Sequence, residues 1–386
     1  MLANKLKEKA KVIHCINLTG LGGVQQSFVP FYNHACRNSL FNYKVFGKGA
    51  IDKEYSNVSC YVNLSDSLYK NLQYLYYLID RRSVIHFYNN LGGPNISRLL
   101  RFLPCSNIVF SERGTVWNAV DSDRKYYKSN AANSQVIIAN SNATKLMLIR
   151  KMEIPPDKIQ VIYNGFFNKM CIKKAESGPK KIVGYVGRLD TPKGVNVLIK
   201  AAKVLENDKD VVFKIAGRGH LESFLREESS GMKNIEFVGR VTNPIEFMKT
   251  IDLLVVPSIR EPFGNVIVEA GYTRLPVIAT MVDGIPEIID NGVSGLLLPP
   301  TEDVSLSDVP LMPVCVVDPE NKELVKPKEL NAELLAHSIN ELLHDEARQQ
   351  RYADNLYKHV TSHFTLDNYF QSVEAVYSDI LSGVFR

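Results

Sequence analysis

Short apolar, β-branched runs alternate with amphipathic helical stretches along nearly the whole chain. Apolar runs in the first half predict five strands, at residues 11–18, 83–88, 106–112, 135–141 and 158–164. The stretch at 24–38, directly after the first run, predicts a helix. Strands separated by helices are typical of parallel βαβ units, so the first half is expected to form an α/β domain.

The second half repeats this alternation more regularly. Its apolar runs predict six strands, at residues 181–189, 211–219, 234–241, 252–258, 275–280 and 294–299. Helical periodicity fills the intervals between them, and two further helices are predicted at 332–360 and 366–381. The regular spacing predicts a second parallel α/β domain.

The domain boundary is predicted from a loss of periodicity. Residues 164–181 gain Gly, Pro and Lys and have the character of a linker. A chain of 386 residues is too long for one ordinary core. We therefore expect a domain over 1–165, a second over 166–365 with an irregular Pro-rich insert at 301–330, and a C-terminal helix over 366–386 that returns to the first domain.

Composition narrows the class of protein. Hydrophobic residues make up 45% and charged residues 23% of the chain, which is ordinary for globular proteins. The six cysteines are scattered without a CxxC pair, so we expect neither a disulfide framework nor a zinc site, and a reducing cytoplasm. No apolar run is long enough to cross a bilayer, and the basic start lacks a signal-peptide core. We expect a soluble or peripheral protein.

Charge is distributed unequally between the two halves. Residues 1–165 carry 13 Lys and 8 Arg against 10 acids, a net charge of +11, whereas residues 166–386 carry 25 basic and 31 acidic side chains, a net of −6. A basic half is suited to an anionic membrane surface or a phosphorylated substrate, and equally to a solvated surface. Without a Lys/Arg tract, nucleic acid is the weakest of these readings.

The stretch REPFGNVIVEAGYTRLPVIAT, residues 260–280, carries the most specific chemistry. It follows a predicted strand, and a helix is predicted to begin at Asn265 and Val266, where backbone N–H groups form an anion site. Glu261 lies in the loop, where it can accept bonds from sugar hydroxyls. Glu269 lies about one helical turn past Asn265, where it can accept both hydroxyls of a ribose. The alternatives are a hydrolase acid pair, or one loop acid and one solvated helix acid.

This stretch resembles the E-x7-E signature of the retaining glycosyltransferases of family 4. The segments at 184–201, 213–219, 235–241 and 283–299 resemble the neighbouring segments of that family. The resemblance implies the GT-B fold, which is α/β with two Rossmann-like domains facing each other across a cleft. It also implies transfer of a sugar from a nucleotide diphosphate sugar, for which UDP is the expected nucleotide.

The resemblance assigns roles to residues of this chain. Arg188 and Lys193 flank a tight turn and would neutralise a diphosphate leaving group. Glu261 would contact the sugar, which completes the expected catalytic set. The remaining residues expected to bind the donor are Gly22, Gly23, Gly187, Gly217, Arg240, Val241, Phe263, Gly264, Asn265, Val266 and Glu269.

The acceptor side departs from the family pattern. Many members carry a histidine after the strand that corresponds to NIVFSERG, and here Arg113 stands nearest that place, beside Glu112. An arginine does not accept a proton at working pH. His86, at a strand end, is an alternative polar group, although a satisfied strand histidine is the favoured interpretation of it. What replaces the usual histidine stays open.

The sequence predicts no metal and no cofactor besides the donor. Asp121-Ser122-Asp123 imitates a DxD metal motif but lies in a polar stretch typical of a solvated turn. Bacterial relatives build surface polysaccharides such as lipopolysaccharide and capsule, so the expected acceptor is a glycan or a lipid-diphosphate-linked sugar at the inner face of the cytoplasmic membrane. The alternatives are a nucleotide-sugar epimerase and a non-catalytic sugar-nucleotide binding protein.

Overall fold

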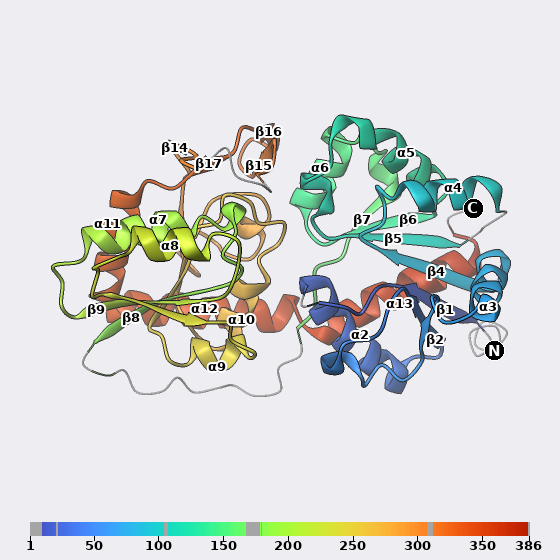
Figure 1. The fold of residues 1–386 in the computed structure, drawn as a ribbon, viewed down its shortest axis with the longest axis horizontal. Helices are drawn as coiled ribbons and strands as arrows, with labels where there is room; N and C mark the ends of the chain where they lie inside the picture. The colour runs from blue at the N-terminus through green and yellow to red at the C-terminus, as the bar shows by residue number, and fades with distance from the viewer. Residues whose placement is uncertain are drawn as a thin grey trace. The chain divides into compact units, whose positions relative to one another are not determined.

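The protein was analysed as a computed structural model that describes residues 10–20, 22–103, 107–166, 178, 180–306 and 312–384. The chain divides into two compact units (Figure 1). The first comprises Met1–Phe167 and Phe364–Arg386, and the second comprises Asn168–His363. Most of the predicted linker lies outside the described residues. Within the described ranges, no helix is long and apolar enough to cross a membrane.

The first unit is built on a seven-stranded parallel sheet of order β3-β2-β1-β4-β5-β6-β7. Its strands are β1 (Lys11–Cys15), β2 (Asn42–Gly47), β3 (Tyr61–Asn63), β4 (Ser83–Tyr88), β5 (Ile108–Glu112), β6 (Val136–Ala139) and β7 (Ile159–Val161). All five predicted strands are present. Strands β2 and β3 were not predicted, because neither is a long apolar run: β2 is half polar and β3 has only three residues.

Helices cover both faces of the first sheet (Figure 1). Helices α4 (Pro94–Phe102), α5 (Arg124–Ala132) and α6 (Asn142–Arg150) lie on one face, and α2 (Gly23–Asn38) and α13 (Leu366–Ser382) lie on the other. Helix α3 (Leu68–Ile79) packs near β4. The C-terminal helix α13 buries Val373, Val376 and Ile380 in the same core as α2. Residues far apart in sequence therefore share one hydrophobic core.

The second unit is built on a six-stranded parallel sheet of order β10-β9-β8-β11-β12-β13. Its strands are β8 (Lys181–Val186), β9 (Val211–Ala216), β10 (Ile235–Gly239), β11 (Leu253–Val256), β12 (Val277–Thr280) and β13 (Leu296–Leu298). In Figure 1, α7 (Val195–Val204), α8 (Glu222–Glu228) and α11 (Ala332–Leu343) cover one face, and α9 (Pro244–Met248), α10 (Asn265–Tyr272) and α12 (Glu346–His363) cover the other.

The single helix predicted over 332–360 is wrong: the structure has two helices there, α11 and α12. The break falls at His344 and Asp345. The Asp345 carboxylate accepts a bond from the Arg348 backbone N–H at 2.9 Å, which caps the first turn of α12. Asp is a strong N-cap residue, so it starts a new helix where the apolar periodicity alone continues.

The insert at 301–330 is more ordered than predicted. It forms two short antiparallel pairs, β14 (Glu302–Asp303) with β17 (Lys328–Glu329) and β15 (Val316–Asp318) with β16 (Glu323–Val325). Residues 307–311 lie outside the described residues.

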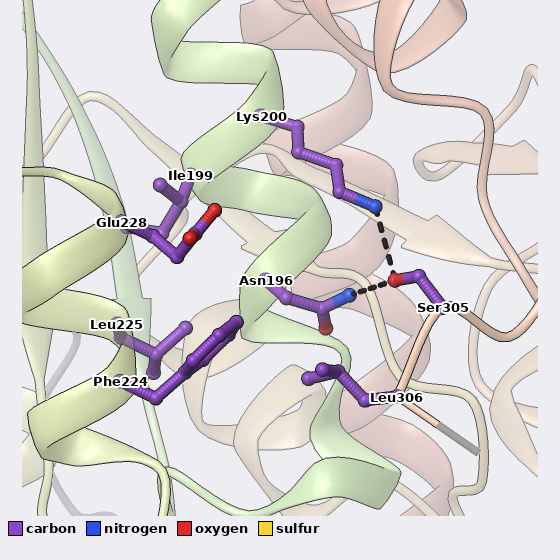
Figure 2. A pocket seen from close by; sticks show the side chains of 8 residues that line it. All are labelled: Asn196, Ile199, Lys200, Phe224, Leu225, Glu228, Ser305 and Leu306. Atoms are coloured by element: carbon purple, nitrogen blue, oxygen red, sulfur yellow. Dashed lines mark hydrogen bonds between the residues drawn. The ribbon is translucent and has the colours of Figure 1, made fainter.

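Polar contacts hold this insert on helix α7. The buried carboxylate of Glu329 accepts bonds from Asn196 at 3.1 Å, Lys200 at 3.2 Å and Ser305 at 3.2 Å. Figure 2 shows Asn196 and Lys200 both pointing toward Ser305. The small cavity beside them has a volume of about 30 Å³, which suits a water molecule rather than a nucleotide. It is lined by none of the residues predicted to bind the donor.

Candidate functional site

The candidate donor residues gather where the order of the second sheet reverses. Strands β8 and β11 are neighbours in the sheet but are separated in sequence by β9 and β10. Ligands of open α/β sheets bind at the carboxyl ends of the strands at such a switch point. Arg188 follows β8, and Glu261 follows β11. The topology thus brings both residues to one edge of the sheet.

Lys193 and Glu261 form a close ion pair at this edge. The Lys193 Nζ lies 2.5 Å from Glu261 Oε2, and the two side chains are 22% and 10% exposed. Lys193 ends the short 3-10 helix Thr191–Lys193. The next residue, Gly194, has a φ of +64°, and a Cβ there would lie 2.0 Å from the Pro257 carbonyl oxygen. The turn that carries Lys193 therefore packs directly against the end of β11.

The Arg188 side chain forms an ion pair with Asp190 and is otherwise largely exposed to solvent. Its Nη1 lies 2.6 Å from Asp190 Oδ2, yet its side chain is 59% exposed. The buried Asp190 also bonds His220 Nδ1 at 3.0 Å, and His220 Nε2 lies 3.2 Å from Thr191 Oγ1. The sequence predictions did not include His220. The glycine turn GRGH directly after β9 could have indicated that His220 lies at this edge of the sheet.

Asp283 fixes the loop of Glu261 and was also missed. Its Oδ2 accepts from the Glu261 backbone N–H at 2.9 Å, and its Oδ1 accepts from the Val317 N–H at 2.7 Å. Its own N–H donates to the Val317 carbonyl at 3.0 Å. Asp283 is 1% exposed and has a φ of +48°. Strand β15 of the insert is therefore bonded, through one carboxylate, to the loop of a predicted catalytic residue.

Helix α10 begins as the sequence predicted. Gly264, at φ +109°, precedes its first residue Asn265 and has no side chain that could cap the helix. The backbone N–H groups of the first turn therefore need hydrogen-bond acceptors other than an N-cap side chain. Phe263 is buried, while Asn265 and Val266 are half-buried.

Glu269 lies one turn into this helix, and its carboxyl is largely removed from water. This burial raises the pKa of Glu269 to about 7. The side chain therefore titrates near neutral pH.

The glycines predicted to bind the donor lie at adjacent strand ends. The Gly187 N–H donates to the Ala216 carbonyl at 3.0 Å, and the Gly217 N–H donates to the Gly239 carbonyl at 2.8 Å. A Cβ on Gly217 would lie 1.9 Å from the Gly187 carbonyl oxygen, so the backbones approach too closely for any side chain. Beyond β10, Arg240 is exposed and Val241 is half-buried.

In the first unit the glycine pair lies after β1, next to the reversal of strand order between β1 and β4. Gly22 is the N-cap residue of α2, and Gly23 is its first residue. The Gln26 N–H donates to the Gly22 carbonyl at 3.1 Å. The N-terminus of α2 thus lies at the corresponding edge of the first sheet.

His86 and Glu112 are enclosed in the first unit. The ring nitrogens of His86 lie 2.7 Å from Tyr377 Oη and 2.7 Å from Ser111 Oγ, and burial holds its pKa well below the usual range. The Glu112 carboxylate accepts from the N–H groups of Gly114 and Val116 at 3.0 and 3.1 Å, and burial raises its pKa. Both side chains have their hydrogen bonds inside the fold, while Arg113 between β5 and this turn stays partly exposed.

Comparison with known proteins agrees with this arrangement. Residues 168–309 match the family model described as Glycosyl transferases group 1. An uncharacterized glycosyltransferase of Methanocaldococcus jannaschii, MJ1607, is 28% identical over 255 residues, which cover 59% of this chain and 65% of that protein. The capsular polysaccharide biosynthesis glycosyltransferase CapM of Staphylococcus aureus is 25% identical over 263 residues, or 64% and 62%. The matches thus span less than two thirds of either relative.

A solved structure resembles the whole chain. Anabaena Alr3699/HepE, crystallised in complex with UDP-glucose, superposes with a TM-score of 0.73 at 18% identity, over 94% of this chain and 98% of that one. At this identity the likeness shows the fold, which is the GT-B fold of two Rossmann-like units. The match to the glycosyl transferases group 1 model lies within the second unit and covers residues 168–309 of this chain.

Proposed function

We propose that the protein transfers a sugar from a nucleotide diphosphate sugar to a hydroxyl of an acceptor, with retention at the anomeric carbon. The main support for the proposal is that Arg188, Lys193 and Glu261 lie together at the switch point of the second sheet, beside the start of α10. Two cations and a helix N-terminus suit a diphosphate, and a loop carboxylate suits sugar hydroxyls.

Each residue then has one task. Arg188 and Lys193 stabilise the negative charge that develops on the leaving diphosphate. Glu261, with Phe263, Gly264 and Asn265, orients the sugar. Glu269 accepts the ribose hydroxyls in its ionised form. Catalysis by these groups consists of charge stabilisation and positioning, and the leaving phosphate takes the proton of the acceptor hydroxyl.

The other predicted contacts complete the donor site. Gly187 and Gly217 let the backbone approach the donor, and Arg240 with Val241 lies beside its base. Gly22 and Gly23, at the start of α2, are proposed as phosphate contacts, as the family resemblance implies. UDP is the proposed nucleotide, because the related fold of Anabaena Alr3699/HepE was crystallised with UDP-glucose.

The proposed acceptor is a glycan or a lipid-diphosphate-linked sugar used in bacterial surface polysaccharide synthesis. Two observations support it: the name of the Staphylococcus aureus relative, which refers to capsular polysaccharide biosynthesis, and the net charge of +11 over residues 1–165. Such a charge favours the anionic inner face of the cytoplasmic membrane. The proposed location is peripheral to that face.

A thermal-shift screen of nucleotide sugars tests the donor, because a ligand that binds the folded state raises the unfolding midpoint. The hit is then incubated with the enzyme, and its hydrolysis and transfer are followed by release of nucleotide diphosphate. We expect Glu261→Ala and Glu269→Ala both to lower transfer strongly. Normal transfer by Glu261→Ala would reject the role of the first acid. Release of nucleotide diphosphate with a free altered sugar would favour an epimerase, and no turnover with retained binding would favour a silent binding protein.

A further inference from the structure

Arg113 is a fixed cation without a matching anion. Its Nη2 donates to the Tyr369 hydroxyl, and its guanidinium lies 5.8 Å from the ring centroid of Tyr88 and 5.4 Å from that of Tyr369. We call these two residues the tyrosine clamp. Across the residues that the structure describes, no carboxylate is paired with Arg113, and its Nη1 is buried without a hydrogen-bond acceptor.

The backbone of Arg113 is fixed as firmly as its side chain. Its N–H donates to Asn89 Oδ1 at 3.0 Å, and Asn89 has a φ of +52°, a left-handed conformation that costs energy for a side chain other than glycine. On the other side, the Glu112 carboxylate holds the turn at 114–116.

The groups that face Arg113 do not neutralise it. Glu112 directs its carboxylate into its own turn. His86 and His14, which lie near the tyrosine clamp, are held neutral by burial. The two residues of the tyrosine clamp are phenols, which do not carry negative charge near neutral pH. A guanidinium costs free energy when it is partly removed from water without an anion, so this arrangement is suited to a partner from outside.

The position of Arg113 in the sheet fits the same conclusion. It directly follows β5, and Tyr88 ends β4, so both lie at the carboxyl edge where ligands of parallel sheets bind. The first 165 residues also carry the net charge of +11 that attracts anions.

We propose that Arg113 and the tyrosine clamp form a receptor for an anionic group, a phosphate or diphosphate, on the acceptor. This inference rests on the proposed function, because it names the class of acceptor. The guanidinium has N–H donors beyond the one that it gives to the Tyr369 hydroxyl, and these match phosphate oxygens, while the nearby rings of Tyr88 and Tyr369 keep it oriented.

The test is a titration of the full chain with inorganic phosphate by calorimetry at low salt, with the donor site filled by UDP. We expect Arg113→Gln to weaken phosphate binding by about tenfold or more, and Arg113→Lys to give an intermediate loss, because lysine keeps the charge without the planar fork. The matched control is Arg101→Gln, which removes one charge from an exposed arginine of α4 in the same unit and should leave the affinity within about twofold. Equal phosphate affinity for Arg113→Gln and wild type would overturn the proposal.

A second variant separates binding from folding. Tyr369→Phe removes the hydroxyl that Arg113 bonds but keeps the ring and the guanidinium, and we expect it to retain phosphate binding within about threefold. If Tyr369→Phe loses phosphate binding as completely as Arg113→Gln, with the same fall in unfolding midpoint, Arg113 is only an anchor for α13 and the proposal fails.

The source of the phosphate is resolved by vesicle flotation. Phosphatidylcholine vesicles with and without phosphatidic acid are compared for wild type and Arg113→Gln. Binding that needs both phosphatidic acid and Arg113 supports a lipid-linked acceptor, whereas phosphate binding without flotation supports a soluble phosphorylated one. If UDP does not bind the wild type, the proposed function is rejected. The difference in phosphate affinity between Arg113→Gln and wild type would still test the role of Arg113.

Discussion

The ammonium of Lys193 and the carboxylate of Glu261, residues 68 positions apart, form a 2.5 Å ion pair at the switch point of the second sheet. Each of these predicted catalytic residues therefore neutralises the charge of the other. A nucleotide diphosphate sugar would exchange this pair for two new ones, Lys193 with the diphosphate and Glu261 with the sugar hydroxyls. The pair keeps two partly buried charges matched.

Glu261→Gln should therefore separate nucleotide binding from transfer. Without its carboxylate partner, Lys193 is released for the diphosphate, so we expect UDP to bind up to about tenfold more tightly while transfer falls. Calorimetry with UDP and a transfer assay measure the two effects. Lys193→Gln is the matched variant and should weaken UDP binding. If Glu261→Gln weakens UDP binding as much as Lys193→Gln does, the two residues do not exchange partners in this way.

Asp283→Asn should lower transfer through the loop of Glu261. In Asp283 one carboxylate oxygen accepts from the Glu261 N–H and the other from the Val317 N–H. Asparagine has a single amide oxygen, so its NH₂ group would face one of these two N–H donors. We expect a loss of about 1–3 kcal/mol in unfolding free energy and a fall in kcat, with UDP affinity nearly unchanged.

Asp303→Asn is the control for Asp283, because it removes an exposed carboxylate from the insert that Asp283 contacts. Denaturant unfolding, UDP calorimetry and transfer kinetics are compared for the two variants. An equal loss of UDP affinity and of kcat in Asp283→Asn would indicate general damage to the unit rather than an effect on Glu261.

Glu269 should make both stability and donor binding depend on pH near neutrality. Its pKa is about 7 in the folded protein and near 4.5 when unfolded, so the unfolded state binds fewer protons between these values. Stability therefore falls as pH rises through this window. Glu269→Gln mimics the protonated form, and its unfolding free energy should exceed that of wild type by roughly 1–3 kcal/mol at pH 8 but differ little at pH 5.

Donor affinity should change in the opposite direction. The ionised carboxylate is the better acceptor for ribose hydroxyls, so UDP should bind wild type more tightly at pH 8 than at pH 6, whereas Glu269→Gln should show a weaker and flatter profile. Calorimetry at several pH values measures this. The same pH profile in both proteins would exclude Glu269 as the titrating group.

Gly194→Ala should damage the turn that carries Lys193. The new Cβ would meet the Pro257 carbonyl oxygen at 2.0 Å at a φ of +64°, so strain and a backbone clash add. Gly231→Ala is the control, because Gly231 has a φ of +84° in open space. We expect about 1 kcal/mol of destabilisation for Gly231→Ala, and clearly more for Gly194→Ala together with weaker UDP binding. Equal effects of the two substitutions would show that backbone strain alone accounts for the loss.

Several features of this protein are determined by local sequence. Apolar runs such as 83–88 and 181–186 form strands here, because a parallel strand that is buried on both faces is typically a continuous apolar segment. The glycine before Asn265 and the apolar periodicity after it likewise predict the start of α10. The motif residues Arg188, Lys193 and Glu261 were named through the resemblance to family 4, and their catalytic roles stay predictions.

Other features depend on which segments the fold brings together. No local pattern indicates that Asp283 bonds both Glu261 and Val317, or that His220 supports Asp190, because these contacts join separate strands and loops. The enclosure of His86 and Glu112 likewise depends on α13 and on a turn, neither of which is visible in the strand sequence. Periodicity encodes burial within one element, whereas the partners of a polar side chain, and so its charge and its chemistry, are decided by tertiary packing.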